Sequence, residues 1–161
     1  MRRIFIGMAL ALIVVPAAAQ TQKDIDHCNG GWNMSANLVV EGCTAMIQSS
    51  HLGNQDRAIA YNNRGLQYGE QNQIDRAIDD FNQAIRLNPS YAGAFSNRGL
   101  AYGHKNRLDL AILDFSRAIR LNPNFATPYY LRGIAKQRSG DQAGGNADIA
   151  KARQINPNIG K

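Results

Sequence analysis

Apolar and small side chains recur along most of the chain at the spacing of an amphipathic helix. In residues 58–69, Tyr61, Gly65 and Tyr68 follow one another at intervals of four and three, which places them on one face of a helix. Residues 75–87 have the same spacing in Ala77, Phe81, Ala84 and Leu87. The pattern therefore predicts two consecutive helices, each with one apolar face.

This pair of helices returns at a constant interval and with no gap. The copies are residues 58–91, 92–125 and 126–159. Between the predicted helices lie Asn72, Asn106 and Gly140, residue types that tolerate a left-handed turn. An Asn-Pro pair follows each second helix and ends it, because proline lacks the amide donor and restricts the residue before it. A fixed period of this length predicts an all-α solenoid of three helical hairpins.

The recurring residues resemble the tetratricopeptide repeat (TPR). Counted from Ala58, Ala92 and Ala126 as position 1, that family has small residues at positions 8, 20 and 27, aromatic residues at 4, 11 and 24, and proline at 32. The first copy has Tyr61, Gly65, Tyr68, Ala77, Phe81, Ala84 and Pro89 there, and the second has Phe95, Gly99, Tyr102, Ala111, Phe115, Ala118 and Pro123. The third keeps Tyr129, Gly133, Ala152 and Pro157, but has Lys136, Gly145 and Ile149 at positions 11, 20 and 24.

The resemblance also implies a binding surface. First helices of TPR hairpins line a concave face, where the family binds peptides or protein segments. The corresponding residues are Asn62, Asn63, Leu66, Glu70, Ser96, Asn97, Leu100, His104, Tyr130, Ile134, Gln137 and Arg138. Some members clamp a peptide's C-terminal carboxylate with basic residues, but the matching positions here hold Ile59, Asn62, Thr127 and Leu131. We therefore expect no full clamp, while the asparagines could bond the backbone of an extended peptide.

An arginine and an aspartate recur together in every copy. Arg64, Arg98 and Arg132 occupy position 7, and Asp80, Asp114 and Asp148 follow them at the same interval each time. The pattern has two interpretations, an ion pair between the helices of each hairpin or a row of ligand-binding arginines. The ion pair is favoured, because a ligand would require only the arginine to recur.

Residues 1–19 have the pattern of a secretory signal peptide. Arg2 and Arg3 precede an apolar run over residues 4–15, and Ala17 and Ala19 supply a small-x-small cleavage site before Gln20. An uncleaved anchor is the alternative, and twin-arginine export stays open. The run is too short to span a bilayer, so we expect no stable membrane insertion after cleavage. The prediction is export to the periplasm, with secretion as the alternative.

Residues 20–57 are predicted to be an N-terminal arm and a capping helix, with Ser35 as the helix N-cap. Cys28 and Cys43 are the only cysteines, and an even count in an exported chain favours a disulfide between them. Free thiols are one alternative. A metal site is the other, because His27, Cys28, Cys43 and His51 are four potential zinc ligands.

The net charge and the absence of catalytic motifs narrow the range of possible functions. The formal net charge is +6, and it falls to +4 (6 − 2) when Arg2 and Arg3 leave with the signal peptide. The remaining basic residues are spread along the period, as on a solvated surface, so nucleic acid is not an expected partner. No catalytic motif occurs, and no cofactor is expected. The sequence thus favours a non-catalytic protein–protein interaction module of the bacterial cell envelope, an adaptor or assembly factor.

The predicted partner is a protein or peptide held in the concave groove. Two alternatives stay open. The partner could instead be a second copy of the chain bound through the third repeat. The rival function is an enzyme or metal-dependent accessory protein whose site lies in the N-terminal cap.

Overall fold

A computed structural model describes residues 17–30 and 34–161 of the chain. These residues form eight helices: α1 (Ala17–Cys28), α2 (Ala36–Gln48), α3 (Asn54–Glu70), α4 (Ile74–Leu87), α5 (Ala92–His104), α6 (Leu108–Leu121), α7 (Ala126–Arg138) and α8 (Gln142–Ile155). The described part of the chain contains no strand. The all-α hairpin solenoid predicted from the sequence is confirmed, and it includes one hairpin more than the three repeats.

The turns and helix ends follow the predicted residue types. Asn72 and Asn106 have φ angles of 59° and 56°, and Gly140 has 100°, which is the left-handed region that glycine and asparagine tolerate best. Asn88, Asn122 and Asn156 are the C-caps of α4, α6 and α8, each in an extended conformation before its proline. The Ser35 side chain caps α2 by accepting a hydrogen bond from the Leu38 amide.

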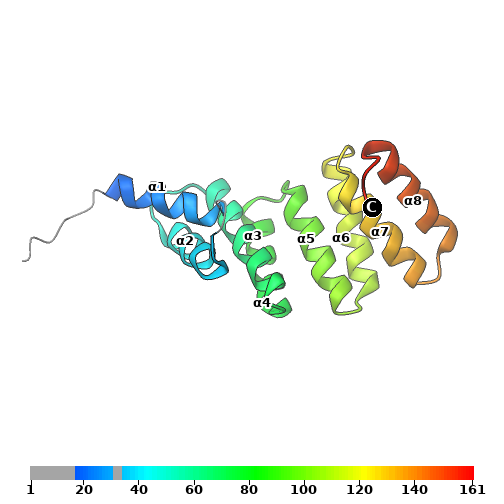
Figure 1. The fold of residues 1–161 in the computed structure, drawn as a ribbon, viewed down its shortest axis with the longest axis horizontal. Coiled ribbons are helices and arrows are strands. Elements are labelled where there is room, and N and C mark those ends of the chain that lie inside the picture. The colour runs from blue at the N-terminus through cyan, green and yellow to red at the C-terminus, as the bar shows by residue number, and fades with distance from the viewer. Residues whose placement is uncertain (1–16, 31–33) are drawn as a thin grey trace, which may run out of the picture.

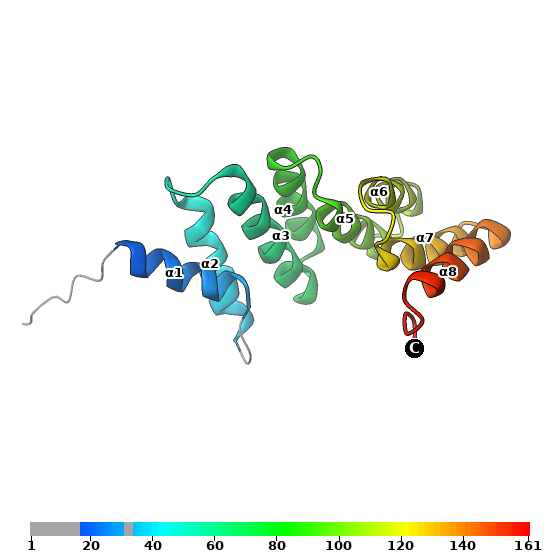
Figure 2. The same ribbon diagram turned by 90° about the horizontal axis from the view of Figure 1, so that it is seen from above.

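The hairpins α1–α2, α3–α4, α5–α6 and α7–α8 follow one another along the long axis of the molecule (Figure 1). Each first helix after α1 packs against the second helix of the hairpin before it, and it also contacts the neighbouring first helix. Figure 2 shows the same row from above, with the C-terminus curled back at the α8 end. This arrangement places α3, α5 and α7 side by side.

Small residues let the two helices of a repeat approach closely. A Cβ added at Gly65 would lie 2.8 Å from the Phe81 ring and 3.2 Å from the Ala77 carbonyl oxygen. Gly99 stands in the same relation to Phe115 and Ala111. The aromatic ring of position 24 thus packs directly over a glycine backbone. The packing role that the resemblance assigned to these residues is confirmed.

The N-terminal segment differs from its prediction. Residues 21–26 were expected to form a frayed arm, but they belong to α1, which packs against α2 as an antiparallel hairpin. The reason is burial, because Ile25 and Cys28 join a cluster with Val39, Cys43 and Met46. Residues 1–16 lie outside the described part, so the signal peptide stays a prediction. Among the helices that the structure describes, none is both long and apolar enough to cross a membrane.

The helix α2 has the register of a repeat's second helix, which the sequence pattern had not revealed. The Thr44 hydroxyl donates to the Val40 carbonyl at 2.7 Å, and Ser116 of the second repeat donates to Ile112 at the same distance. Thr44 accepts from Arg64 of the next hairpin as Asn82 accepts from Arg98 and Ser116 from Arg132, so Thr44 occupies position 25. In that register Val39, Cys43 and Met46 occupy positions 20, 24 and 27, and all three are buried.

A four-residue offset explains why this correspondence was missed. The step from Thr44 to Asn82 is 38 (82 − 44), whereas the step from Asn82 to Ser116 is 34 (116 − 82). The difference of four is absorbed where α3 begins, since α3 has 17 residues and α5 has 13. The N-terminal cap is therefore a divergent helical hairpin of the same kind as the repeats.

Candidate functional site

Two adjoining hollows lie along the row of first helices. The first, between α3 and α5, has a volume of about 390 Å³ and is called the N-side hollow. The second, between α5 and α7, has about 300 Å³ and is called the C-side hollow. Leu100 and His104 of α5 line both of them, so the hollows form one continuous groove.

Seven of the twelve predicted binding residues line this groove: Leu66, Glu70, Asn97, Leu100, His104, Ile134 and Arg138. Six of them occupy position 9, which supplies aliphatic side chains, or position 13, which supplies polar ones, and Asn97 occupies position 6. Leu66 and Leu100 are 38% and 40% exposed and both line the N-side hollow, where they form a contiguous apolar surface of the kind that marks interaction sites. Gly65, Phe81 and Phe115 were assigned to packing from the sequence, yet they also line the groove.

The other five predicted residues are placed elsewhere. Asn62 and Ser96 are only 4% and 2% exposed, so position 5 faces the interior. Gln137 donates to the Asn146 side chain within its own hairpin. Tyr130 packs beside the C-terminal turn, because a Cβ added at Gly160 would lie 2.6 Å from its ring.

The asparagines predicted to bond a peptide backbone bond one another instead. Asn97 donates to the side-chain oxygen of Asn62 at 2.8 Å, and Asn62 donates to Asn63 at 3.3 Å. Asn63 then donates to the backbone carbonyl of Cys28 at 3.2 Å. This chain of hydrogen bonds links the second repeat, the first repeat and the N-terminal hairpin. Satisfied amides of this kind serve the scaffold, and Asn97 alone also lines the groove.

The recurring arginines form ion pairs, as the sequence favoured. In each repeat Nε and Nη2 of the arginine donate to the two carboxylate oxygens of the aspartate, at 2.7–2.9 Å. The third nitrogen, Nη1, reaches the preceding hairpin: Arg64 bonds Thr44, Arg98 bonds Asn82 and Arg132 bonds Ser116. Every arginine therefore joins its own two helices and the hairpin before it, which leaves no row of arginines for a ligand.

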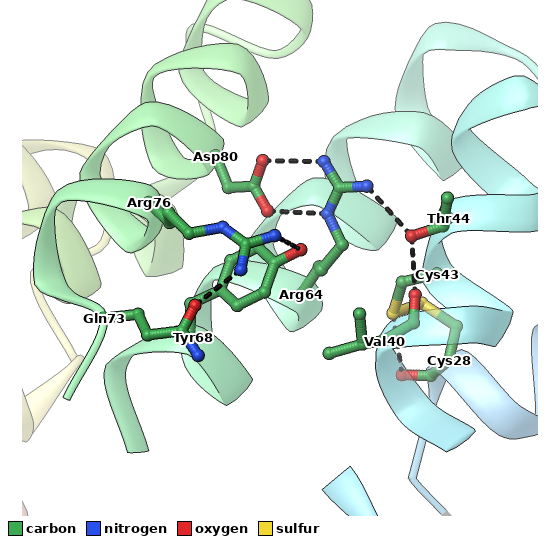
Figure 3. A network of polar contacts seen from close by, with 9 residues as sticks. All are labelled: Cys28, Val40, Cys43, Thr44, Arg64, Tyr68, Gln73, Arg76 and Asp80. Carbon is green, nitrogen blue, oxygen red and sulfur yellow. Dashed lines mark hydrogen bonds and ion pairs between the residues drawn. A yellow bond between two sulfur atoms is a disulfide. The ribbon is translucent and has the colours of Figure 1, made fainter. Parts of the chain in front are cut away.

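Figure 3 shows this arrangement at the first repeat, where Arg64 lies between Asp80 and Thr44. The hydrogen bond to Asp80 raises the pKa of Arg64, although burial acts in the opposite direction. Arg98 has the same shift from Asp114. Both guanidinium groups stay charged at any pH at which the fold exists. Arg76 also stacks over the Tyr68 ring, 3.9 Å from its centroid.

The third repeat carries an additional cation. Lys136, which replaces the tyrosine of position 11, pairs with Asp148 at 2.9 Å beside Arg132. Burial favours the protonated form of Asp148, but the two cationic hydrogen bonds outweigh it and lower the pKa of Asp148 below its usual value. The departure from the repeat pattern thus places a charge where the first two repeats have a ring.

The proposed metal ligands of the cap are not available as a set. Cys28 and Cys43 form a disulfide, and both are buried. His27 packs over Gly42, while His51 is exposed in the loop after α2. Within residues 17–30 and 34–161, no three His, Cys, Asp or Glu side chains gather as metal ligands. The disulfide prediction is confirmed.

Comparison with known proteins agrees with the repeat pattern. The model of the family described as Tetratricopeptide repeat matches residues 58–91 and 92–125. The chain therefore carries two tetratricopeptide repeats that match the family model, followed by a third copy with the same fold. Among curated proteins, none matches the sequence.

Solved structures share the architecture. The crystal structure of MamA is 25% identical and has a TM-score of 0.66, over 76% of this chain and 69% of that one. The first TPR domain of Spaghetti (RPAP3), bound to the HSP90 peptide SRMEEVD, is 24% identical with a TM-score of 0.64, over 68% and 86%. YrrB, a TPR protein with an unusual peptide-binding site, is 16% identical with a TM-score of 0.64, over 77% and 62%.

Proposed function

We propose that this chain is a non-catalytic protein–protein interaction module of the bacterial cell envelope, an adaptor or assembly factor that holds a partner segment in the groove of α3, α5 and α7. The observation that carries the proposal is the exposed pair Leu66 and Leu100 over two open hollows. Concave, mostly apolar surfaces with a few polar groups are typical of binding sites. The RPAP3 domain and YrrB, which share the fold, are both described as peptide binders.

The proposed location in the cell envelope rests on the predicted signal peptide and on the disulfide of the N-terminal hairpin. A cleaved signal peptide over residues 1–19 would export the chain to the periplasm, with secretion as the alternative. A disulfide between Cys28 and Cys43 supports an oxidising compartment, because cytosolic thiols are kept reduced. N-terminal sequencing of the exported protein tests this part, and a retained Met1 would contradict it.

A second copy of the chain is the weaker candidate partner. Ile112 of the second repeat packs in a cluster with Leu131 of the next hairpin, whereas its counterpart in the third repeat is Asn146. Lys136 stands where Tyr102 does, and it is paired with Asp148. The end of the third repeat is therefore polar and offers little apolar area for self-association.

The test compares leucines inside and outside the groove. We expect the variant carrying Leu66→Ser and Leu100→Ser to lose partner recovery from envelope extract after crosslinking, because the apolar floor of both hollows is removed. Leu113→Ser is the matched control, since Leu113 is 61% exposed on α6 and lies outside both hollows. Equal recovery by both variants would show that the partner binds another face.

A further inference from the structure

The groove carries an ordered series of ionisable side chains, from acidic at one end to basic at the other. Position 13 supplies Glu70 in α3, His104 in α5 and Arg138 in α7, and all three side chains are exposed. Glu70 and His104 line the N-side hollow, whereas His104 and Arg138 line the C-side hollow. No other charged or histidine side chain lines either hollow. One end of the groove is therefore acidic, and the other end is basic.

The arginine at the basic end is held in place. Its Nη2 donates to the side-chain oxygen of Asn106 at 2.9 Å. Asn106 sits in the left-handed turn between α5 and α6, so this bond ties Arg138 to the preceding hairpin. Arg138 is exposed and lines the C-side hollow, and a guanidinium group carries further donors that can bind a carboxylate.

The acidic end is open. Glu70 is the last residue of α3 and is exposed, and among the described residues no hydrogen-bond or ion-pair partner is found for its carboxylate. Lys105, which follows His104 at the end of α5, does not pair with Glu70, because it is paired with Asp75 of α4. A cation from outside the chain can therefore reach Glu70 without displacing an internal ion pair.

Between the charged ends runs an aliphatic row of one side chain per repeat, Leu66, Leu100 and Ile134. Apolar hollows favour apolar occupants, and complementary charges at the rim set the orientation and exclude other partners. Surface ion pairs contribute modestly to affinity but discriminate well between like and opposite charges.

We infer that the groove selects a partner segment with opposite charges at its two ends: a basic side chain at Glu70, an acidic side chain at Arg138, and aliphatic side chains between them in the hollows. This inference rests on the proposed function and specifies the chemistry of its partner. Segments with two basic or two acidic ends are disfavoured, because one end would meet a like charge.

The test is selection from a displayed library of random peptides, which requires no assumed spacing. Wild-type protein is expected to enrich sequences with aliphatic residues between one basic and one acidic residue. Arg138→Glu should shift the enrichment to basic residues at both ends, and Glu70→Lys should shift it to acidic residues. The control variants Arg153→Glu and Asp79→Lys have the same charge changes at exposed sites outside the hollows, and they should enrich the wild-type set.

One enriched peptide is then measured by fluorescence anisotropy against the same variants. Reversing one groove charge should weaken its binding about threefold, the size expected of a partly exposed ion pair, and higher salt should reduce that difference. Reversing the matching charge in the peptide should restore the affinity. Because Glu70 and Arg138 are exposed, both variants should have the melting temperature of the wild type.

The outcomes separate this inference from the proposed function. If enriched peptides require Leu100 but show the same end charges with every variant, the charge rule is wrong and the groove is still the binding site. If enriched peptides bind Leu100→Ser as well as wild type, both proposals fail. If enrichment follows net charge in the control variants too, the selection is non-specific and the charge rule is again wrong.

Discussion

The second helix of the N-terminal hairpin has the register of the repeats, but the two helices of that hairpin are joined by different chemistry. In the repeats, position 8 is glycine and position 24 is a bulky side chain packed against it. In the N-terminal hairpin Cys43 occupies position 24, and a disulfide to Cys28 of α1 joins the two helices covalently instead. Position 23, which is the ion-paired aspartate in the repeats, is Gly42 in this hairpin, and His27 packs on it.

The difference shows that the inter-helix contact of the fold can be made in more than one way. A short helix such as α1, with 12 residues, buries less surface than α3 and gains less from packing. A disulfide compensates by restricting the unfolded chain. The link to the next hairpin is nevertheless the same, because Arg64 bonds Thr44 as Arg132 bonds Ser116.

The largest expected effect is loss of the disulfide. Replacing both Cys28 and Cys43 by serine should destabilise the N-terminal hairpin by about 3 kcal/mol, from the loop-entropy estimate for a separation of 15 residues. Native-state hydrogen exchange should show α1 and α2 opening first, while α5 to α8 keep their protection, because each hairpin contacts only its neighbours. Uniform loss of protection would mean that the cap and repeats unfold as one unit.

The next effect is overpacking of a repeat. Ala111 is fully buried, and its carbonyl oxygen lies close to Gly99. Ala111→Leu should lower the free energy of unfolding by about 2 kcal/mol, because extra methylenes there force the two helices apart. Urea denaturation measures the change, with Asp79→Leu on the exposed face of α4 as the control. A similar loss in both variants would contradict the packing described for position 20.

Acid should weaken the third repeat through Asp148. Because the folded-state pKa of Asp148 is lowered, its stabilisation is present above the unfolded pKa of about 4 and is lost as pH falls through the folded value. We expect Asp148→Asn to cost about 1.5 kcal/mol at neutral pH, the size of hydrogen bonds to a charged group, and much less in acid. Thermal melts from pH 7 down to the acid limit of the fold measure this difference, and a cost that stays constant over that range would rule out the linkage.

The smallest effect tests the register of the N-terminal hairpin directly. Thr44→Val removes the hydroxyl that accepts from Arg64, and Ser116→Ala removes the one that accepts from Arg132. Each should cost about 1 kcal/mol, since one hydrogen bond to a charged donor is lost at a partly exposed site. Gln48→Ala is the control, because Gln48 would align with Asn82, and would be the acceptor, if the period of the repeats continued unbroken. A larger cost at Gln48 would overturn the register.

Much of the fold could be predicted because its determinants are local and repeat. Each hairpin is marked in the sequence by its glycine (Gly65, Gly99 or Gly133), by a residue type that tolerates a left-handed turn and by an Asn-Pro pair at its end. The recurrence of arginine with aspartate indicated that the two side chains pair. The hairpin register of α2 could not be predicted, because four extra residues before the first repeat break the period while burial of Val39, Cys43 and Met46 restores the packing.

The sequence by itself determined the three hairpins, the disulfide and the positions that pack them, because each of these depends on short-range spacing and on residue types with few alternatives. The tertiary structure decided which polar residues are free. Asn62 and Ser96 were predicted to face the groove, but both are buried, and Asn62 accepts a hydrogen bond from Asn97 of the next hairpin. Exposure of Glu70, His104 and Arg138 likewise depends on how successive first helices are placed, and helix periodicity carries no information about contacts made between hairpins.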